Sequence, residues 1–404
     1  MNRTAQRTPP PSAGLDAERR LRILVTQPTI GLHGGGDALA AWTLQALRDL
    51  GEVTLVAFEP PDCGVINRYY GTSLHPGDFR FERVPLPWWS RAIPTRSYLL
   101  RIGLVLRHCR RLDRRQPYDV LLSTNNEVDF GRRGVQYVHA PRAFAEAPRE
   151  EWSWYHHLPG ALRGYRAFIR LLSGASEARA LENLTLVNSE FIAGEVRKAY
   201  GISSIVLYPP VPGDFPTVGW DDRADAIVCL GRLHPCKRLV EIIEIVDRLR
   251  TRGSHLRLTM IGSRDDVPAY EVRLREMAAA RSEWLTLHVA LPRAEMVQEL
   301  SRHRYAIHAM VGEHFGIAVG EMVRAGCIPF VHDSGGPPAI VGGDRRLRFT
   351  SVEDAVAAIE RVVARPDLQQ ELLAGLAERR ELYSEQHFMA GMRQVVERFA
   401  RSEL

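Results

Sequence analysis

Two short motifs in the second half of the chain hold the residues best suited to chemistry. In the first, Gly231 and Arg232 are followed by Lys237; in the second, seven residues separate Glu313 from Glu321. Two fixed cations can neutralise a diphosphate and stabilise it as a leaving group. Two carboxylates can accept hydrogen bonds from ribose and sugar hydroxyls. The motifs predict a site for a nucleotide diphosphate joined to a sugar; the alternative is a basic loop and a buried structural acid.

Lysine is rare in this chain. Of 53 basic residues, only Lys198 and Lys237 are lysines. A compact ammonium and a planar guanidinium are not interchangeable at a phosphate. The lysine at position 237 therefore indicates a chemical role.

The elements that must position these motifs alternate between short apolar strands and amphipathic helices, as in parallel α/β sheets. The first set of expected strands covers residues 22–26, 53–58, 79–84, 120–123, 135–138 and 184–188. The second set covers residues 226–230, 256–261, 285–290, 305–309 and 328–332. Between them, Tyr208 to Pro212 is rich in proline, which fits neither a helix interior nor a central strand. We predict two α/β domains that face each other across a cleft.

Composition sets the remaining boundaries. Residues 1–20 are polar, contain three consecutive prolines and are expected to form a disordered tail. We then expect an N-terminal domain over 21–207, a linker over 208–225 and a C-terminal domain over 226–384. No run approaches the roughly 18 apolar residues of a membrane span. The five cysteines are scattered without a CxxC pair, which favours a reduced, cytoplasmic protein.

Two features of the N-terminal half are candidates for a ligand site. A glycine-rich turn over residues 31–36 follows the first strand but matches neither GxGxxG nor a P-loop. It suits a backbone that approaches a ligand or the other domain, or it is a plain tight turn. His139 follows the strand 135–138, where its ring would point into the cleft. The ring could hydrogen-bond a sugar hydroxyl or stabilise developing charge. The alternative is a structural histidine.

Arg91–Arg115 holds eight arginines and one aspartate and follows Trp88-Trp89. Such a basic amphipathic helix can lie on an anionic membrane, although a solvated face above a core face explains it as well. The sequence contains no recognised nucleic-acid-binding module. We expect no metal site, because the histidines and cysteine between His308 and His332 lack ligand spacing. Asp265 is expected to be a solvated loop acid.

Taken together, these residues resemble the family 4 nucleotide-sugar glycosyltransferases, which have two Rossmann-like domains in the GT-B fold. The likeness covers about residues 20–400 and rests on Gly231-Arg232…Lys237, Glu313…Glu321 and Ser334-Gly335-Gly336-Pro337. Tyr137-Val138-His139-Ala140-Pro141 and Gly34-Gly35-Gly36-Asp37 are similar to segments of the mannosyltransferases that extend dolichol-linked oligosaccharides.

The resemblance implies a role for each matched residue. Arg232 and Lys237 would bind the donor diphosphate, Glu321 the ribose, and Leu291 would lie near the base. Glu313 and His139 are the catalytic candidates, Glu313 bonding the sugar and His139 facing it. Gly35 and Gly36 would pack against phosphate and sugar, while Phe315, Gly316 and Ile317 would supply backbone amides. The helix over 385–404 would cross back onto the N-terminal domain.

The chain departs from the family pattern at two positions. Ala339 stands where an acid is common, which bears on the identity of the donor. Ala290 stands where the family has glycine, before the residue that contacts the base.

We therefore expect a retaining glycosyltransferase that moves a hexose from a nucleotide diphosphate, preferably mannose from GDP-mannose, to a glycan or lipid-linked acceptor without a metal or other cofactor. The alternatives are a UDP-sugar donor, a sugar phosphorylase and a non-catalytic sugar-nucleotide-binding protein. The protein is expected to be cytoplasmic, with peripheral contact at the inner membrane face through Arg91–Arg115, and not to bind nucleic acid.

Overall fold

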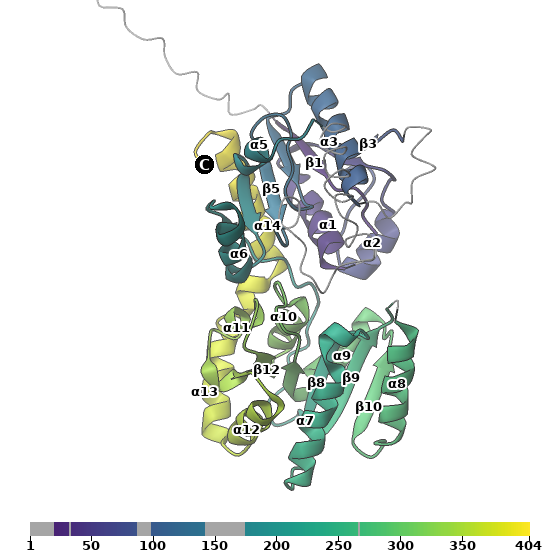
Figure 1. Cartoon of the computed structure of the whole chain (residues 1–404), viewed down its shortest axis with the longest axis vertical. Coiled ribbons are helices and arrows are strands. Elements are labelled where there is room, and N and C mark those ends of the chain that lie inside the picture. The colour runs from purple at the N-terminus through teal and green to yellow at the C-terminus, as the bar shows by residue number, and fades with distance from the viewer. Residues whose placement is uncertain (1–19, 32–33, 87–97, 142–173, 266) are drawn as a thin grey trace, which may run out of the picture.

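The computed structural model of the protein describes residues 20–31, 34–86, 98–141, 174–265 and 267–404. Their strands form two parallel sheets in two domains (Figure 1). The strand orders are β3-β2-β1-β4-β5-β6-β7 and β10-β9-β8-β11-β12-β13. In each sheet the order reverses beside the first strand, between β1 and β4 and between β8 and β11. These are the switch points where open α/β sheets bind ligands.

The N-terminal domain contains the sheet of β1 to β7. Its strands are β1 (Leu21–Thr26), β2 (Gly51–Ala57), β3 (Arg80–Arg83), β4 (Val120–Ser123), β5 (Val135–Val138), β6 (Leu184–Val187) and β7 (Ile205–Val206). Its helices are α1 (Gly35–Leu47), α2 (Cys63–Tyr70), α3 (Tyr98–Arg115), α5 (Glu177–Leu181) and α6 (Glu190–Tyr200). The central strands are continuous apolar runs because helices cover both of their faces.

The C-terminal domain contains the second sheet. Its strands are β8 (Ala224–Arg232), β9 (Arg257–Ser263), β10 (Leu285–Val289), β11 (His303–His308), β12 (Ile328–His332) and β13 (Arg348–Phe349). Its helices are η4 (Pro235–Lys237), α7 (Leu239–Thr251), α8 (Pro268–Ala279), α9 (Arg293–Ser301), α10 (Ile317–Arg324), α11 (Pro337–Ile340), η5 (Arg345–Leu347), α12 (Val352–Val363), α13 (Pro366–Ala377) and η6 (Arg380–Tyr383).

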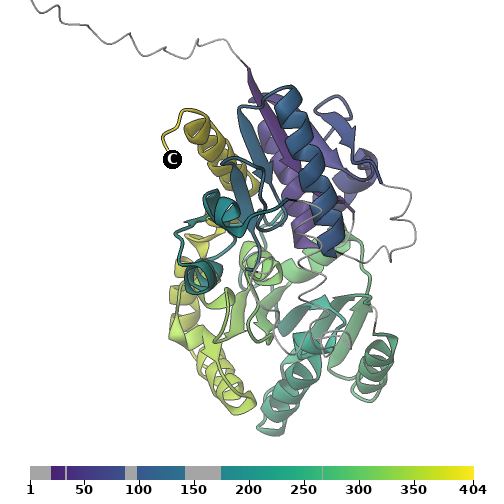
Figure 2. The ribbon, with the colours of Figure 1, turned by 45° about the horizontal axis from the view of Figure 1, so that its top comes forward.

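The final helix, α14 (Glu385–Ala400), returns to the N-terminal domain (Figures 1 and 2). Its N-cap Ser384 accepts a hydrogen bond from the amide of His387. Phe388, Met392 and Val396 are buried in the core formed by α1 and the first sheet. This packing confirms the expected crossing helix, and the two sheets confirm the expected α/β architecture.

Several boundaries differ from the sequence-based expectation. The short edge strands β7 and β13 and the helix α2 were not predicted. Apart from Arg20, the tail over residues 1–20 lies outside the described residues. Among the described residues, no helix is long and apolar enough to cross a membrane.

Helix α3 uses its apolar face inside the protein. Leu104, Val105 and Cys109 are buried against β1 and β2. Arg110 is also buried, with its guanidinium 3.3 Å from the carboxylate of Asp129. The apolar face of α3 is therefore not available to a membrane; Arg91, like the rest of residues 87–97, lies outside the described residues.

Candidate functional site

Lys237 and Glu313 form an ion pair at the carboxyl ends of two adjacent strands. Lys237 follows β8 and Glu313 follows β11, and these strands pair in parallel. The ammonium of Lys237 lies 2.5 Å from Glu313 Oε2 and 3.1 Å from Met310 Sδ. Both side chains are largely buried, with exposed fractions of 14% and 17%. The pair spans the switch point of the C-terminal sheet, where a ligand is expected.

A buried histidine stands behind the Glu313 carboxylate. His308 Nε2 lies 3.6 Å from Glu313 Oε2, and the His308 side chain is only 3% exposed. Burial by itself raises the pKa of Glu313, but the interaction with His308 and the charge of Lys237 outweigh burial and hold that pKa below its ordinary value. Glu313 is therefore an ionised hydrogen-bond acceptor at neutral pH, and it cannot act there as a proton donor.

The backbone around Glu313 is held by the segment Ser334-Gly335-Gly336. Gly336 donates its amide hydrogen to the carbonyl of Glu313 over 2.8 Å. Gly312 donates to the Ser334 hydroxyl over 2.9 Å. A Cβ on Gly335 would lie 2.2 Å from the carbonyl oxygen of Glu313, and Gly335 has a φ of +76°. Only glycine allows this approach, so the Gly335-Gly336 pair helps to position the backbone of Glu313.

Glu321 lies one helical turn inside α10 and is 5% exposed. Its Oε1 accepts a hydrogen bond of 2.5 Å from Arg293, the first residue of α9. Helix α10 begins after Gly316, which has a φ of +101°. The first turn of a helix leaves amide groups without intrahelical acceptors, so this end of α10 can donate to an anion or a sugar oxygen.

Phe315 has a second, structural role. Its ring packs at centroid distances of 6.0 Å from Tyr208 in the linker and 5.8 Å from Tyr383. Tyr208 and Tyr383 contact each other at 5.2 Å. This aromatic cluster fixes the Glu313 loop against the point where the chain passes between domains.

The N-terminal domain faces the Glu313 loop directly. A Cβ on Gly35 would lie 2.6 Å from Ile317 Cδ1, and one on Gly36 would lie 3.7 Å from His139 Nε2. The hydroxyl of Ser189 donates to the carbonyl of His314 over 2.6 Å. The structure thus brings the glycine turn, His139 and the start of α10 to one junction between the domains.

The hydrogen bonds of His139 define its tautomer. Its Nε2 lies 3.0 Å from the carbonyl oxygen of Thr124, which can only accept, so Nε2 carries the proton. Burial lowers the pKa of His139, and the nearby His314 lowers it further. The neutral ring keeps Nδ1 as an acceptor, and Nδ1 has no protein partner among the described residues. His139 can therefore accept a hydrogen bond from a hydroxyl group.

Arg232 and Leu291 contact residues other than the ion pair. Arg232 is 57% exposed and binds Asp265 at 2.8 Å. Asp265, at 12% exposure, is therefore not the solvated loop acid expected from the sequence. Leu291 packs against the apolar cluster of Met296 and Met322.

Ala290, just before Leu291, has a φ of +58°. This left-handed conformation is a physical reason for the glycine that the resembling family has at this position.

Arg293 and His308 were missed by the sequence analysis. Neither belongs to a spaced motif, and each meets its carboxylate only through the fold. Within the described part of the chain, no cluster of three or more His, Cys, Asp or Glu side chains suits a metal ion.

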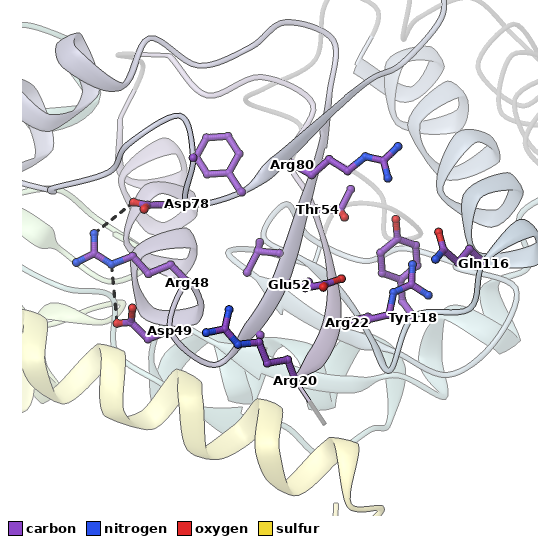
Figure 3. A pocket seen from close by; sticks show the side chains of 14 residues that line it. Arg20, Arg22, Arg48, Asp49, Glu52, Thr54, Asp78, Arg80, Gln116 and Tyr118 are labelled. Atoms are coloured by element: carbon purple, nitrogen blue, oxygen red, sulfur yellow. Dashed lines mark hydrogen bonds and ion pairs between the residues drawn. The ribbon is translucent and has the colours of Figure 1, made fainter. Parts of the chain in front are cut away.

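A polar pocket of about 440 Å³ lies elsewhere, at the amino ends of β1 to β3 (Figure 3). Three of its four arginines already have partners: Arg48 lies 3.3 Å from Asp78, Arg80 lies 2.6 Å from Glu82, and Arg22 donates to the carbonyl of Pro117 over 2.6 Å. The predicted site residues stand at the opposite, carboxyl ends of the strands. We therefore place the candidate site at the domain junction.

Comparison with protein families matches residues 213–376 to the model described as Glycosyl transferases group 1. Curated relatives include the GDP-Man:Man(3)GlcNAc(2)-PP-Dol alpha-1,2-mannosyltransferase of Dictyostelium discoideum, 23% identical over 52% of this chain and 46% of the relative. The human protein of that name is 33% identical over 38% of this chain and 35% of its own length. The matched region thus covers less than half of either relative.

Solved structures resemble nearly the whole chain. A sucrose-phosphate synthase from Thermosynechococcus elongatus superposes with a TM-score of 0.66 at 14% identity, covering 95% of this chain and 100% of that one. WaaG, a glycosyltransferase involved in lipopolysaccharide biosynthesis, gives a TM-score of 0.63 at 13% identity, covering 93% and 99%. At these identities the likeness establishes the fold, which is GT-B as expected.

Replacing Gly335 by alanine tests how the Glu313 loop is held. We expect Gly335→Ala to lower the free energy of unfolding by about 2–4 kcal/mol, because the new Cβ collides with backbone in a left-handed conformation. Gly375→Ala is the matched control: Gly375 lies exposed in α13, and a Cβ there meets nothing within 4 Å. It should raise stability by up to about 1 kcal/mol. Denaturant unfolding measures both, and wild-type stability in Gly335→Ala would contradict the account.

Proposed function

Because residues 213–376 form a Glycosyl transferases group 1 domain, we propose that the protein is a retaining glycosyltransferase that uses a nucleotide diphosphate sugar. The observation that carries the proposal is the Lys237–Glu313 pair at the switch point; close to it, Ile317 meets the Gly35-Gly36 turn, which lies beside His139. A cation for the leaving diphosphate and a permanent anion for the sugar stand side by side. Glu321, one turn inside α10, supplies a carboxylate for the ribose.

The proposed reaction breaks the bond between the anomeric carbon of the sugar and the β-phosphate oxygen. The electron pair leaves with the diphosphate, and Lys237 and Arg232 stabilise its charge. An acceptor hydroxyl forms the new bond on the same face and passes its proton to the leaving phosphate. Glu313 stays ionised throughout and accepts a sugar hydrogen bond, while its charge stabilises the positive charge that develops on the ring.

GDP-mannose is the donor that we propose. The support comes from the curated relatives, whose names state a GDP-mannose donor, and from the segments around Gly36 and His139. We also propose that the reaction needs no metal, because Lys237 and Arg232 can carry the counter-charge. A UDP-sugar is the alternative donor, and the bound base distinguishes the two.

For the acceptor we propose a glycan or a lipid-linked glycan, which agrees with the names of the curated relatives. We further propose a cytoplasmic location with peripheral attraction to anionic lipid. The exposed arginines on α3, Arg107, Arg111, Arg114 and Arg115, support this attraction. Because the apolar face of α3 is buried, the attraction would be electrostatic and should weaken with salt.

Nucleotide binding tests the proposal most simply. We expect GDP and GDP-mannose to raise the melting temperature with and without EDTA, because a ligand that binds only the folded state stabilises it by mass action. A response to UDP or UDP-sugars alone would keep the fold and discard mannose. A protein that responds to no nucleotide but releases sugar 1-phosphate with inorganic phosphate would be a phosphorylase. Tight binding without turnover on any acceptor would indicate a non-catalytic binding protein.

His139 predicts a pH dependence for sugar recognition. Its folded-state pKa lies below the ordinary 6.5, so the neutral ring prevails at neutral pH and protonation is opposed in the fold. The stability that this group contributes is present above about pH 6.5 and falls as pH drops through the folded-state pKa. Calorimetry should show that the affinity for GDP-mannose, whose diphosphate does not titrate near neutral pH, is constant above pH 6.5 and declines at more acid pH.

The His139→Gln variant should lose this acid dependence. His75→Gln, at an exposed histidine away from the site, should keep it. An acid dependence that survives in His139→Gln would remove His139 from the sugar site.

A further inference from the structure

Two arginine side chains of the C-terminal domain donate hydrogen bonds to backbone carbonyls of the linker. Arg293 from α9 donates to the carbonyl of Pro212, and Arg324 from α10 donates to the carbonyl of Val211. Arg324 also binds Glu385, the first residue of α14, at 2.7 Å. The segment Val211 to Gly213 is thus fixed by side chains of the C-terminal domain and of the crossing helix.

Backbone amides of the linker also donate hydrogen bonds, to residues at the end of η6 and the start of α14. Val211 donates to the carbonyl of Tyr383 over 2.9 Å, and Gly213 donates to Glu385 Oε1 over 2.9 Å. A Cβ on Gly320, in the middle of α10, would lie 2.7 Å from Val211 Cγ2. Helix α10 therefore packs directly on the linker, and a shift of one moves the other.

Arg293 bonds both to the linker backbone and to Glu321. One guanidinium nitrogen binds Glu321 Oε1 at 2.5 Å, and the other binds the linker carbonyl. Glu321 Oε2 has no protein partner among the described residues. Arg293 thus holds one oxygen of the carboxylate and leaves the other oxygen open to a ligand.

We propose that Arg293 is a positioning residue that orients Glu321 for the donor ribose and couples ribose binding to the linker between the domains. This inference rests on the proposed function, because it takes Glu321 as the ribose-binding residue. The planar fork of arginine matters because one group must span a carboxylate and a carbonyl at fixed angles. Ribose hydroxyls that bind Glu321 would also fix Arg293, and through it the backbone of Pro212.

Two probes isolate the ribose contact: GDP and its 2′,3′-dideoxy form. Wild-type protein should prefer GDP by about 10- to 100-fold, the usual effect of hydrogen bonds to a charged group. In Arg293→Ala this preference should shrink by about 10-fold, a coupling of the size found between groups in direct contact. Arg302→Ala is the matched control, because Arg302 is the C-cap of the same helix and its side chain, 67% exposed, forms an ion pair with Glu299.

Hydrogen exchange of the linker provides the second readout. In wild type, GDP should slow exchange of the Val211 and Gly213 amides more than dideoxy-GDP does. In Arg293→Ala the two nucleotides should slow it equally. Arg293→Lys keeps the positive charge but lacks the planar fork. It should therefore bind GDP better than Arg293→Ala does. Its linker amides should nevertheless exchange as fast with GDP bound as those of Arg293→Ala. Melting temperatures check that each variant is folded.

The outcomes separate this inference from the proposed function. If wild type binds neither nucleotide, the proposed function fails. If wild type prefers GDP but Arg293→Ala and Arg293→Lys keep the full preference and the wild-type exchange pattern, the proposed function stands and the role of Arg293 is wrong.

Discussion

The ion pair of Lys237 and Glu313 is the interaction on which the arrangement of the site depends. Two charges that are mostly removed from water are stable only when each neutralises the other and their remaining contacts are satisfied. Here η4 brings the ammonium from the end of β8, and the loop after β11 brings the carboxylate. His308, Met310 and the glycines at 335 and 336 fill the space around them. The proposed diphosphate would meet Lys237 as a cation that the fold already holds at the end of β8.

The second constraint is that the site is shared between domains. His139, the histidine proposed to face the sugar, follows β5 of the first domain, whereas the charged pair comes from the second. Contacts of Ser189 with His314 and of Gly35 with Ile317 hold the two halves together. The chain passes between domains twice, once through the linker and once through α14, and both passages meet beside α10. A ligand bound at α10, as proposed, would lie beside both connections between the domains.

The sequence predicts much of the fold and part of the site. The central strands were recognisable because their apolar runs are buried on both faces, and the linker because its prolines exclude regular structure. The short edge strands β7 and β13 lack such runs and were missed. Lys237 and Glu313 stood out through spacing and residue type. Arg293 and His308 did not, because their partners are set by the packing of α9 on the linker and of β11 beneath the loop. Arg232 was expected to follow the strand 226–230 but is the last residue of β8, and its partner Asp265 follows β9, which no sequence pattern links to it.

The most direct test of the central claim compares the affinities of GDP and GMP by calorimetry. Lys237 is predicted to bind the diphosphate, so wild type should prefer GDP, and Lys237→Ala should lose about 10- to 100-fold of GDP affinity while binding GMP almost unchanged. The chain offers a matched control in its other lysine, Lys198, which is 81% exposed on α6. Lys198→Ala should behave as wild type. A Lys237→Ala variant that keeps the full preference for GDP would contradict the assignment of the Lys237–Glu313 junction as the diphosphate site.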